Sequence, residues 1–210
     1  DIKVCITAQH REMLDDVLKL FEINPDYDLN VMETGISLSN TVIKILSGLD
    51  NILQKFKPDL VLIQGDTTTV LTAALTSYYR KIPIAHIEAG LRTDNIYSPW
   101  PEEGNRKMVS TITQYHFAPT LSAKNNLLRE NINSNIIFVT GNTVIDSLIW
   151  AKNKIQNDKR LQEELNTDFS FIDPTKRIIL VTGHRRESFG PGFENICEAL
   201  KQIAKENQDV

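Results

Sequence analysis

The sequence predicts an α/β protein built on a doubly wound, Rossmann-like parallel sheet. Three observations support this fold class. Short apolar runs rich in β-branched residues recur along the chain, helical patterns lie between most of them, and polar turn residues follow several of the runs. Alternating strands and helices of this kind typically form crossover units, in which the strands of one sheet run parallel.

Seven apolar runs are predicted to be strands, because each is short, apolar and bounded by turn residues. They span residues 2–7, 29–32, 60–63, 84–87, 115–118, 136–140 and 178–182. The clearest helix begins after a Ser37 or Ser39 N-cap, carries apolar residues on one face and ends at Lys57-Pro58. Further helices are expected at 11–22, 68–79, 103–113, 122–131, 144–156 and 192–206.

A polar, charged stretch at residues 153–173 separates six closely spaced strand candidates from a seventh, and it reads as a linker or an outer helix. We therefore expect an N-terminal Rossmann-like domain at 1–143, with its first strand missing, and a connecting helix and linker at 144–175. Residues 176–210 would begin a second, truncated domain, since one strand and one helix cannot bury their own apolar surface.

The composition excludes several classes of function. The 210 residues are 41% hydrophobic and 24% charged, and no apolar run approaches the ~20 residues that a membrane span requires. A net charge of −4 argues against a nucleic-acid-binding surface but leaves room for a local cationic pocket for one phosphate group. Cys5 and Cys197 show no metal-binding or redox spacing, so a cytoplasmic protein with reduced thiols and no metal is expected.

Two carboxylates follow predicted strands that are one βα unit apart. Asp66 comes after the strand at 60–63, and Glu88 ends the strand at 84–87. The carboxyl ends of parallel strands meet at one edge of a sheet, where ligands bind, so these side chains are expected to be neighbours. The alternatives are that Asp66 or Thr67 caps a helix and that Glu88 belongs to a structural ion pair, for example with Arg92.

A third carboxylate, Glu102, follows Pro99 and Pro101, which stiffen its turn before a helix begins. We expect it to share a cleft with Asp66 and Glu88. The alternative is that Glu102 and Glu103 only favour the positive end of that helix.

A basic turn follows the seventh predicted strand. His184, Arg185 and Arg186 precede a helix, where guanidinium groups and the helix N-terminus suit a diphosphate; the alternative is a solvated basic turn. Neither a G-x-G-x-x-G nor a G-x-x-x-x-G-K-[ST] motif occurs, which argues against nicotinamide and P-loop chemistry. The role of His86 stays open between function and structure, and His116 is expected to serve ordinary packing in a strand or in the core.

Taken together, the segments QGDTTT, HIEAGLRT, YSPWPEEGNR, TGNTVIDSL and VTGHRRESFG closely resemble the non-hydrolysing UDP-N-acetylglucosamine 2-epimerase family, as does TAQHREMLD at residues 7–15. The resemblance covers nearly the whole chain. It implies two doubly wound domains of the GT-B type with a UDP-sugar substrate between them, and no cofactor. Members are expected to be cytoplasmic homodimers that feed cell-surface polysaccharide synthesis.

The resemblance also implies a reaction, in which UDP is eliminated to give 2-acetamidoglucal and is added back with protonation of C2 on the opposite face. Carried over by motif, the catalytic residues would be Asp66, Glu88, Glu102 and His184, and the substrate-binding residues would be Arg185, Arg92 and Asn142. Crowding of the carboxylates is expected to raise at least one of their pKa values.

Gln9 and His10 match a segment that contacts an allosteric second UDP-sugar in some members. This chain departs from that pattern at Glu12 and at Gly35-Ile36, and the alternative is that Gln9 and His10 cap the helix beginning near Arg11.

Three other functions remain open at this point: a hydrolysing 2-epimerase that releases N-acetylmannosamine, a GT-B glycosyltransferase and a non-catalytic nucleotide-sugar sensor. Members of the family begin with a strand and loop that should precede Asp1, and they extend beyond Val210. The 210-residue piece alone is therefore expected to be inactive.

Overall fold

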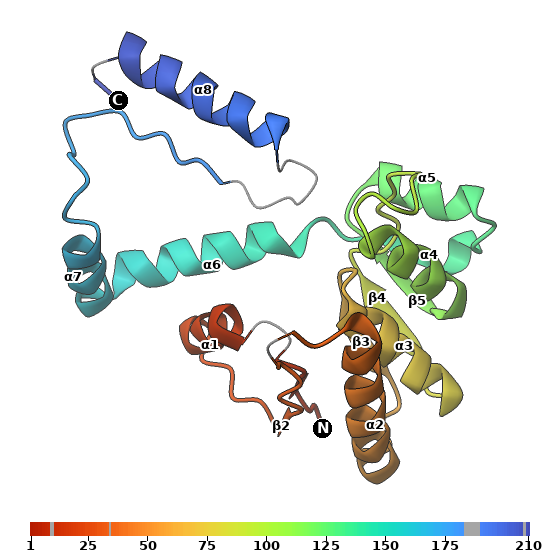
Figure 1. Cartoon of the computed structure of the whole chain (residues 1–210). Helices are drawn as coiled ribbons and strands as arrows, with labels where there is room; N and C mark the ends of the chain where they lie inside the picture. Colours follow the sequence, from red (N-terminus) through yellow and green to blue (C-terminus); the bar gives the residue numbers. More distant parts are fainter. Residues whose placement is uncertain (9–10, 34, 183–189, 208) are drawn as a thin grey trace. The chain divides into compact units, whose positions relative to one another are not determined.

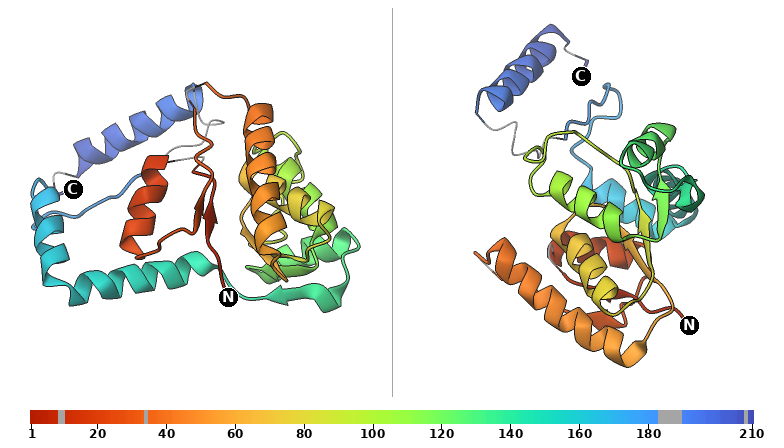
Figure 2. Two further views of the ribbon diagram at one scale, coloured as in Figure 1. Left: turned by 90° about the horizontal axis from the view of Figure 1, so that it is seen from below. Right: turned by 90° about the vertical axis from the view of Figure 1, so that its right-hand side faces the viewer.

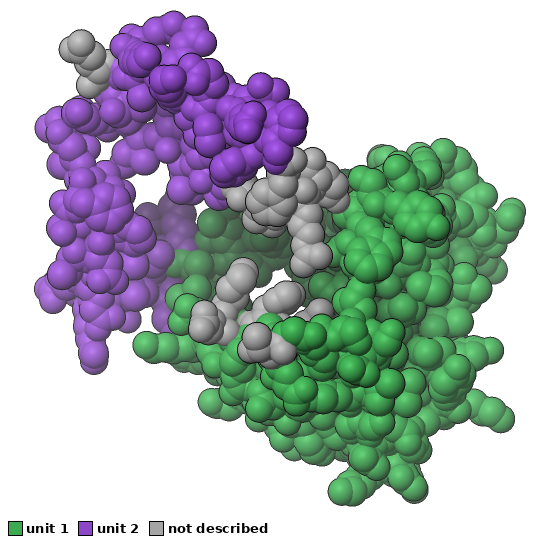
Figure 3. Space-filling model, in the orientation of Figure 1, with its two compact units in different colours: residues 1–151 green, residues 152–210 purple. Residues whose placement is uncertain are grey.

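The computed structural model describes the whole chain except residues 9–10, 34, 183–189 and 208. The chain forms two compact units, Asp1–Ala151 and Lys152–Val210, which Figure 3 distinguishes by colour. The division between them falls inside residues 144–175, the segment expected to connect two domains.

The first unit contains a parallel sheet of four strands (Figure 1). These are β3 (Val61–Gln64), β4 (Ile84–Ile87), β5 (Tyr115–Ala118) and β6 (Ile137–Val139), and they lie side by side in chain order. Every neighbouring pair is parallel, so all four carboxyl ends lie at the same edge. The predicted parallel α/β organisation is confirmed, and four predicted strands form within two residues of their expected limits.

A separate parallel pair, β1 (Cys5–Ile6) with β2 (Tyr27–Asp28), lies in the same unit. β2 forms just before the predicted strand at 29–32. The main chain of Leu29 still donates to the carbonyl of Ile6 at 2.9 Å, but Asn30 has a φ of 43°. The N–H of Val31 also donates to the carbonyl of Thr7 at 3.0 Å, so the hydrogen bonding continues past Asn30, although the left-handed residue interrupts the extended conformation of the strand.

The helices of the first unit follow the predicted ranges closely. They are α1 (Arg11–Leu20), α2 (Leu38–Phe56), α3 (Thr68–Tyr79), α4 (Glu102–Ile112), α5 (Leu121–Arg129) and the first part of α6 (Thr143–Asn157), whose residues 152–157 belong to the second unit, with a 3₁₀ turn at Ser134–Ile136. Of the two predicted N-caps of α2, the structure uses Ser37, whose hydroxyl accepts the N–H of Asn40 at 3.2 Å. Lys57, with a φ of 52°, ends α2 in the left-handed conformation.

Helices α2, α3 and α4 pack in sequence against one another (Figure 2). Apolar residues of these three helices form one core cluster with residues of β3 and β4. The cluster contains Leu49, Leu53, Ile63, Val70, Ala73, Ala74, Ile84 and Val109. A second cluster joins α5 to β5 and β6. Helix α3 buries hydroxyls as well, and Thr72, Thr76 and Ser77 satisfy them by donating to carbonyls four residues earlier.

The second unit contains α7 (Lys159–Asp168) and α8 (Pro191–Glu206). The strand predicted at 178–182 is wrong: these residues form no strand, and Ile178 and Leu180 are 66% and 86% exposed. An apolar run becomes a strand only where another strand satisfies its main chain, and the described residues of this unit supply none. None of the described helices has the length and apolar character needed to span a bilayer.

Candidate active site

The carboxyl ends of β3 and β4 meet at Gly65. Its N–H donates to the carbonyl of Ile87 at 3.1 Å, and its own carbonyl lies 2.7 Å from Nε2 of His86. Gly65 has a φ of 86°, and a Cβ at this position would lie 3.6 Å from Oε2 of Glu88. The residue before Asp66 therefore bonds to Ile87, the last residue of β4, as expected for neighbouring parallel strands.

Asp66 is held by α4. Nε and Nη2 of Arg106 donate to Oδ2 of Asp66 at 2.9 and 2.7 Å, and Nδ2 of Asn105 donates to its main-chain carbonyl at 2.8 Å. Asp66 therefore does not act as a helix cap. Thr67 occupies the N-cap of α3, and its side chain makes no capping hydrogen bond.

Glu88 combines a strained backbone with a half-buried carboxylate. Its φ is 67°, a region that residues with a side chain seldom adopt. The next residue fixes this geometry, because the N–H of Ala89 donates to the carbonyl of Phe117 at 3.1 Å and Ala89 is fully buried. The half-buried carboxylate of Glu88 has no hydrogen-bond or ion-pair partner among the residues that the structure describes. Strain of this kind accumulates at functional sites.

Glu102 and Glu103 have different environments. Glu102 is half-buried at the start of α4, and its side chain has no partner in the described part of the chain. Glu103 is fully buried, accepts the N–H of Asp94 at 3.3 Å and pairs with Nη1 of Arg106 at 3.1 Å. Glu103 is thus a structural anchor of α4, while the carboxylate of Glu102 is available to a ligand.

Arg92 pairs with Glu130 and not with Glu88, the partner that the sequence suggested as an alternative. Its Nε and Nη2 donate to Oε1 and Oε2 of Glu130 at 2.8 and 2.6 Å, and Nη2 also donates to Ser110 at 2.6 Å. The side chain of Arg92 is only 2% exposed. Hydrogen bonding to Arg92 lowers the pKa of Glu130 from its ordinary value. Glu130 meets the planar guanidinium with both oxygens, so it is the better partner.

His86 and His116 are both buried and face each other in register on β4 and β5. Burial lowers the pKa of His86, and it lowers the pKa of His116 to about 4. Both rings are therefore neutral near pH 7. The contact of Nε2 with the carbonyl of Gly65 requires the proton of His86 to reside on Nε2, so His86 supports the turn before Asp66. The buried position of His116 agrees with its predicted packing role.

Asn142 lies after β6 at the same sheet edge, and its Oδ1 accepts the N–H of Val144 at 3.0 Å. It thereby caps the first turn of α6. The residue after Asn142, Thr143, accepts a hydrogen bond through Oγ1 from Nε2 of Gln64, at the end of β3, at 3.2 Å. The other predicted site residues, Gln9, His10, His184 and Arg185, lie outside the described residues.

Asn105 and Arg106 were missed as site residues by the sequence reasoning. The one signal that points to them is the spacing of Glu103 and Arg106, which places an acid and a base on adjacent turns of a helix. That spacing predicts an ion pair on the helix, but it does not predict that the same guanidinium also reaches Asp66.

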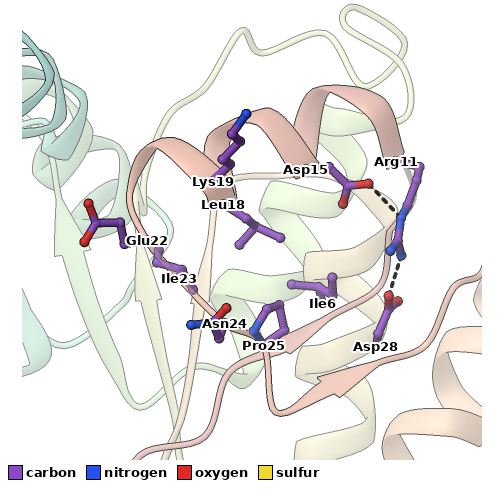
Figure 4. A pocket seen from close by; sticks show the side chains of 10 residues that line it. All are labelled: Ile6, Arg11, Asp15, Leu18, Lys19, Glu22, Ile23, Asn24, Pro25 and Asp28. Carbon is purple, nitrogen blue, oxygen red and sulfur yellow. Dashed lines mark hydrogen bonds and ion pairs between the residues drawn. The ribbon is translucent and has the colours of Figure 1, made fainter. Parts of the chain in front are cut away.

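A separate hollow lies beneath α1 and is lined by residues of α1 and of the turn before β2 (Figure 4). Arg11 pairs there with Asp15 and with Asp28, so its charge is already compensated. No group of histidine, cysteine and acidic residues suited to a metal occurs in the described ranges, and Cys5 and Cys197 form no disulfide.

Comparison with known proteins gives a consistent family match. A sequence profile described as UDP-N-acetylglucosamine 2-epimerase matches residues 1–210. The UDP-N-acetylglucosamine 2-epimerase of Escherichia coli K12 is 56% identical over 210 residues, which are 100% of this chain and 56% of the relative. The Salmonella typhimurium enzyme of the same name is 57% identical with the same coverage. The chain thus spans little more than half the length of these relatives.

Solved structures give the same family match as the sequence relatives. The UDP-GlcNAc 2-epimerase from Neisseria meningitidis, crystallised with UDP-GlcNAc, is 52% identical and superimposes with a TM-score of 0.92, covering 99% of this chain and 56% of the other. The enzyme from Methanocaldococcus jannaschii, in complex with UDP-GlcNAc and UDP, is 36% identical with a TM-score of 0.81, covering 95% and 54%. The fold class predicted from the sequence is confirmed.

Proposed function

Because the chain belongs to the UDP-N-acetylglucosamine 2-epimerase family, we propose that the full-length protein reversibly converts UDP-N-acetylglucosamine to UDP-N-acetylmannosamine. The observation that carries the proposal is the hydrogen bond between Gly65 and Ile87, which brings together the two strand ends that precede Asp66 and Glu88, in a chain whose residues 1–210 match the family model. Relatives crystallised with UDP-GlcNAc support this substrate.

The reaction must break and remake a C–H bond at C2, which is not adjacent to a carbonyl carbon. A base removes the C2 proton, the electrons of that bond form a C1=C2 double bond, and UDP leaves C1 with the electrons of the C1–O bond. The intermediate is 2-acetamidoglucal. Addition of UDP at C1 and delivery of a proton to the other face of C2 then complete the inversion. This sequence needs acid/base groups on both faces of the sugar.

The carboxylates differ in how well they suit this task. Glu88 and Glu102 have no partners in the described structure, so either can exchange a proton without breaking an ion pair. Asp66 uses Oδ2 to bind Arg106, and its Oδ1 accepts no hydrogen bond from the described residues. We assign proton transfer at C2 to the group formed by Asp66, Glu88 and Glu102.

The departing diphosphate requires cationic groups, because negative charge builds up on it as the C1–O bond breaks. The motif match assigns His184 to stabilise or protonate the leaving diphosphate and Arg185 to assist it. Arg92 is enclosed by Glu130 and Ser110, so we place its contribution in the support of the 88–92 turn rather than in direct contact with the substrate.

The direct test is to incubate the full-length protein with UDP-N-acetylglucosamine in D₂O and to follow C2 by NMR. The proposal expects deuterium at C2 in both epimers and an equilibrium mixture of UDP-sugars. Glu88→Gln and Glu102→Gln should each slow exchange by about 10²–10⁴-fold, the usual contribution of one acid/base group.

Other outcomes would replace the proposal. Free N-acetylmannosamine and UDP as the main products would indicate a hydrolysing enzyme, and a product that forms only with an added acceptor would indicate a glycosyltransferase. UDP-sugar binding without isotope exchange would indicate a sensor.

We further propose that the full-length protein is a cytoplasmic homodimer, as the family resemblance implies. Sedimentation of the full-length protein tests the dimer, and a single monomeric species would exclude it. Regulation through Gln9 and His10 predicts a sigmoidal dependence of rate on UDP-N-acetylglucosamine, which Gln9→Ala and His10→Ala should abolish.

A further inference from the structure

Of the three carboxylates assigned to catalysis, helix α4 carries one, Glu102, and binds a second, Asp66. Glu102 is the first residue of α4, and Asn105 and Arg106 lie one turn later on the same helix. Arg106 donates two hydrogen bonds to the carboxylate of Asp66, and Asn105 donates one to its main chain. Asp66 belongs to a different βα unit, so these contacts tie the turn after β3 to the helix that carries Glu102.

The groups that make this connection are shielded from water. Asn105 is 4% exposed, and the side chain of Arg106 is 13% exposed. Hydrogen bonds of this kind cannot be exchanged readily for bonds to water, so the loss of one partner leaves a buried polar group unsatisfied. The buried Asn105 and Arg106 therefore restrict where Asp66 can lie.

Helix α4 itself has a fixed position. Glu103 is fully buried and bonds both to Nη1 of Arg106 and to the main chain of Asp94, while Val109 is fully buried in the core shared with α2 and α3. Because Glu103 holds one end of the guanidinium and Asp66 the other, the plane of Arg106 is locked. Glu102 and Asp66 are thus mounted on one rigid support.

The turn is also held from the opposite side. His86, on β4, bonds through Nε2 to the carbonyl of Gly65, the residue before Asp66. Successive carbonyls at Gly65 and Asp66 therefore bind side chains from two different elements. Such convergence is typical of support around a reacting group, and a displacement of about 1 Å can reduce turnover by about 10²-fold.

Direct binding of the substrate diphosphate by Arg106 is disfavoured by its surroundings. Its guanidinium already donates to two carboxylates, Asp66 and Glu103. The local charge of this trio is negative, and a phosphate group would be repelled by both acids. The guanidinium of Arg106 therefore binds protein carboxylates and not the substrate diphosphate.

We propose that Asn105 and Arg106 are positioning residues that lock Asp66 to α4, so that Asp66 and Glu102 keep a fixed separation during elimination and re-addition. The inference rests on the proposed function. It adds two residues to that function, together with a reason for their burial: they set geometry without touching the substrate.

The test compares Arg106→Met, Arg106→Lys and Asn105→Leu in the full-length protein, with Arg80→Met as the matched control. Arg80 also forms a two-pronged pair with an aspartate, Asp50, in the first unit, at 2.5 and 2.7 Å, and Asp50 belongs to α2, away from the carboxyl edge of the sheet. Turnover of UDP-N-acetylglucosamine, its KM and thermal unfolding are measured for each variant.

A positioning role predicts that kcat falls by about 10²-fold in Arg106→Met, with KM changed by less than about threefold. Arg106→Lys should recover part of the lost kcat, since lysine restores the charge and one donor but not the planar fork. Asn105→Leu should also lower kcat, and Arg80→Met should leave it unchanged. A kcat within twofold of the parent in both Arg106→Met and Asn105→Leu, or an equal fall in Arg80→Met, overturns the proposal.

Amide hydrogen exchange separates this inference from the proposed function. If the unsubstituted protein shows no C2 exchange, the proposed function fails, and exchange at residues 65–69 then decides whether α4 holds this turn. Faster exchange in Arg106→Met and Asn105→Leu, but not in Arg80→Met, supports the lock. Unchanged exchange at 65–69 overturns it.

Discussion

Arg92 and Glu130 form a two-pronged ion pair, with Nε 2.8 Å from Oε1 and Nη2 2.6 Å from Oε2. The pair fastens the turn that follows Glu88 to the end of α5. Ser110 joins the two elements to α4, since it accepts from Nη2 of Arg92 and donates to the carbonyl of Arg106. The support of the carboxylates therefore extends well beyond the residues that could contact a sugar.

Glu130→Gln should destabilise the full-length protein by about 3 kcal/mol, because it leaves the buried guanidinium of Arg92 without a counter-charge. Arg92→Lys should recover little, as lysine cannot reproduce the two parallel bonds. Urea unfolding measures both effects. Glu164→Gln, which removes the exposed pair of Arg160 and Glu164, is the control and should cause no measurable change.

The same pair predicts a dependence of stability on pH. The pKa of Glu130 is lowered from an ordinary value near 4.5, so its stabilisation is fully present above about pH 4.5 and is lost as the pH falls through the lowered pKa. Stability measured between about pH 3 and pH 7 should decline less at the acid end in Glu130→Gln than in the parent. Parallel curves would contradict the assignment.

His116 predicts a second pH effect in a different range. Burial lowers its pKa from 6.5 to about 4, so the unfolded chain takes up a proton more readily than the folded protein. The stabilisation is complete above about pH 6.5 and declines toward pH 4, by about 3 kcal/mol in total. His116→Phe should reduce this slope, and the part due to His86, whose pKa is also lowered by burial, should remain. Glu130→Gln should preserve the slope, and an unchanged slope in His116→Phe would assign it to other groups.

Gly90 predicts a steric effect at the turn between Glu88 and Arg92. Its φ is 89°, and a Cβ there would lie 2.3 Å from the carbonyl oxygen of Ala123. Gly141 has a similar φ of 84° but nothing within 4 Å of its Cβ position. Gly90→Ala should therefore cost about 1–3 kcal/mol more than Gly141→Ala in urea unfolding, since only the first adds a clash to the backbone strain. Equal losses would show that the turn can move away.

The parts of the fold that depend on local pattern could be predicted from the sequence. Burial of both faces of a parallel sheet requires continuous apolar runs, which identified β3 to β6. The adjacency of β3 and β4, the strands that precede Asp66 and Glu88, followed from their connection through a single helix. Strand formation at 178–182 could not be judged this way, because the run has the right residues but finds no neighbouring strand among the residues that the structure describes.

The partners of long charged side chains were beyond prediction from the sequence. Arg92 lies four residues after Glu88, yet it reaches Glu130, which is 38 positions away. Arg106 reaches back 40 positions to Asp66. Both choices depend on how α4 and α5 sit against the sheet, and several acids along the chain offer similar local opportunities. Tertiary packing decides between them.

Glu88 should show opposite effects on stability and activity. Its carboxylate has no partner in the described structure, so Glu88→Gln should change the free energy of unfolding by no more than about 0.5 kcal/mol. Glu88→Gly should raise stability by about 1 kcal/mol, because glycine adopts the φ of 67° without strain. Both variants should lose C2 exchange by about 10²-fold or more.

The comparison separates two explanations of the strained backbone. If the strain persists because the carboxylate is needed at the sheet edge, stability and activity move in opposite directions in Glu88→Gly. Urea unfolding and deuterium exchange at C2, measured on the same samples, give both quantities. A loss of stability in Glu88→Gln would instead mean that Glu88 forms a structural pair, and exchange that persists in both variants would transfer its proposed role to Asp66 and Glu102.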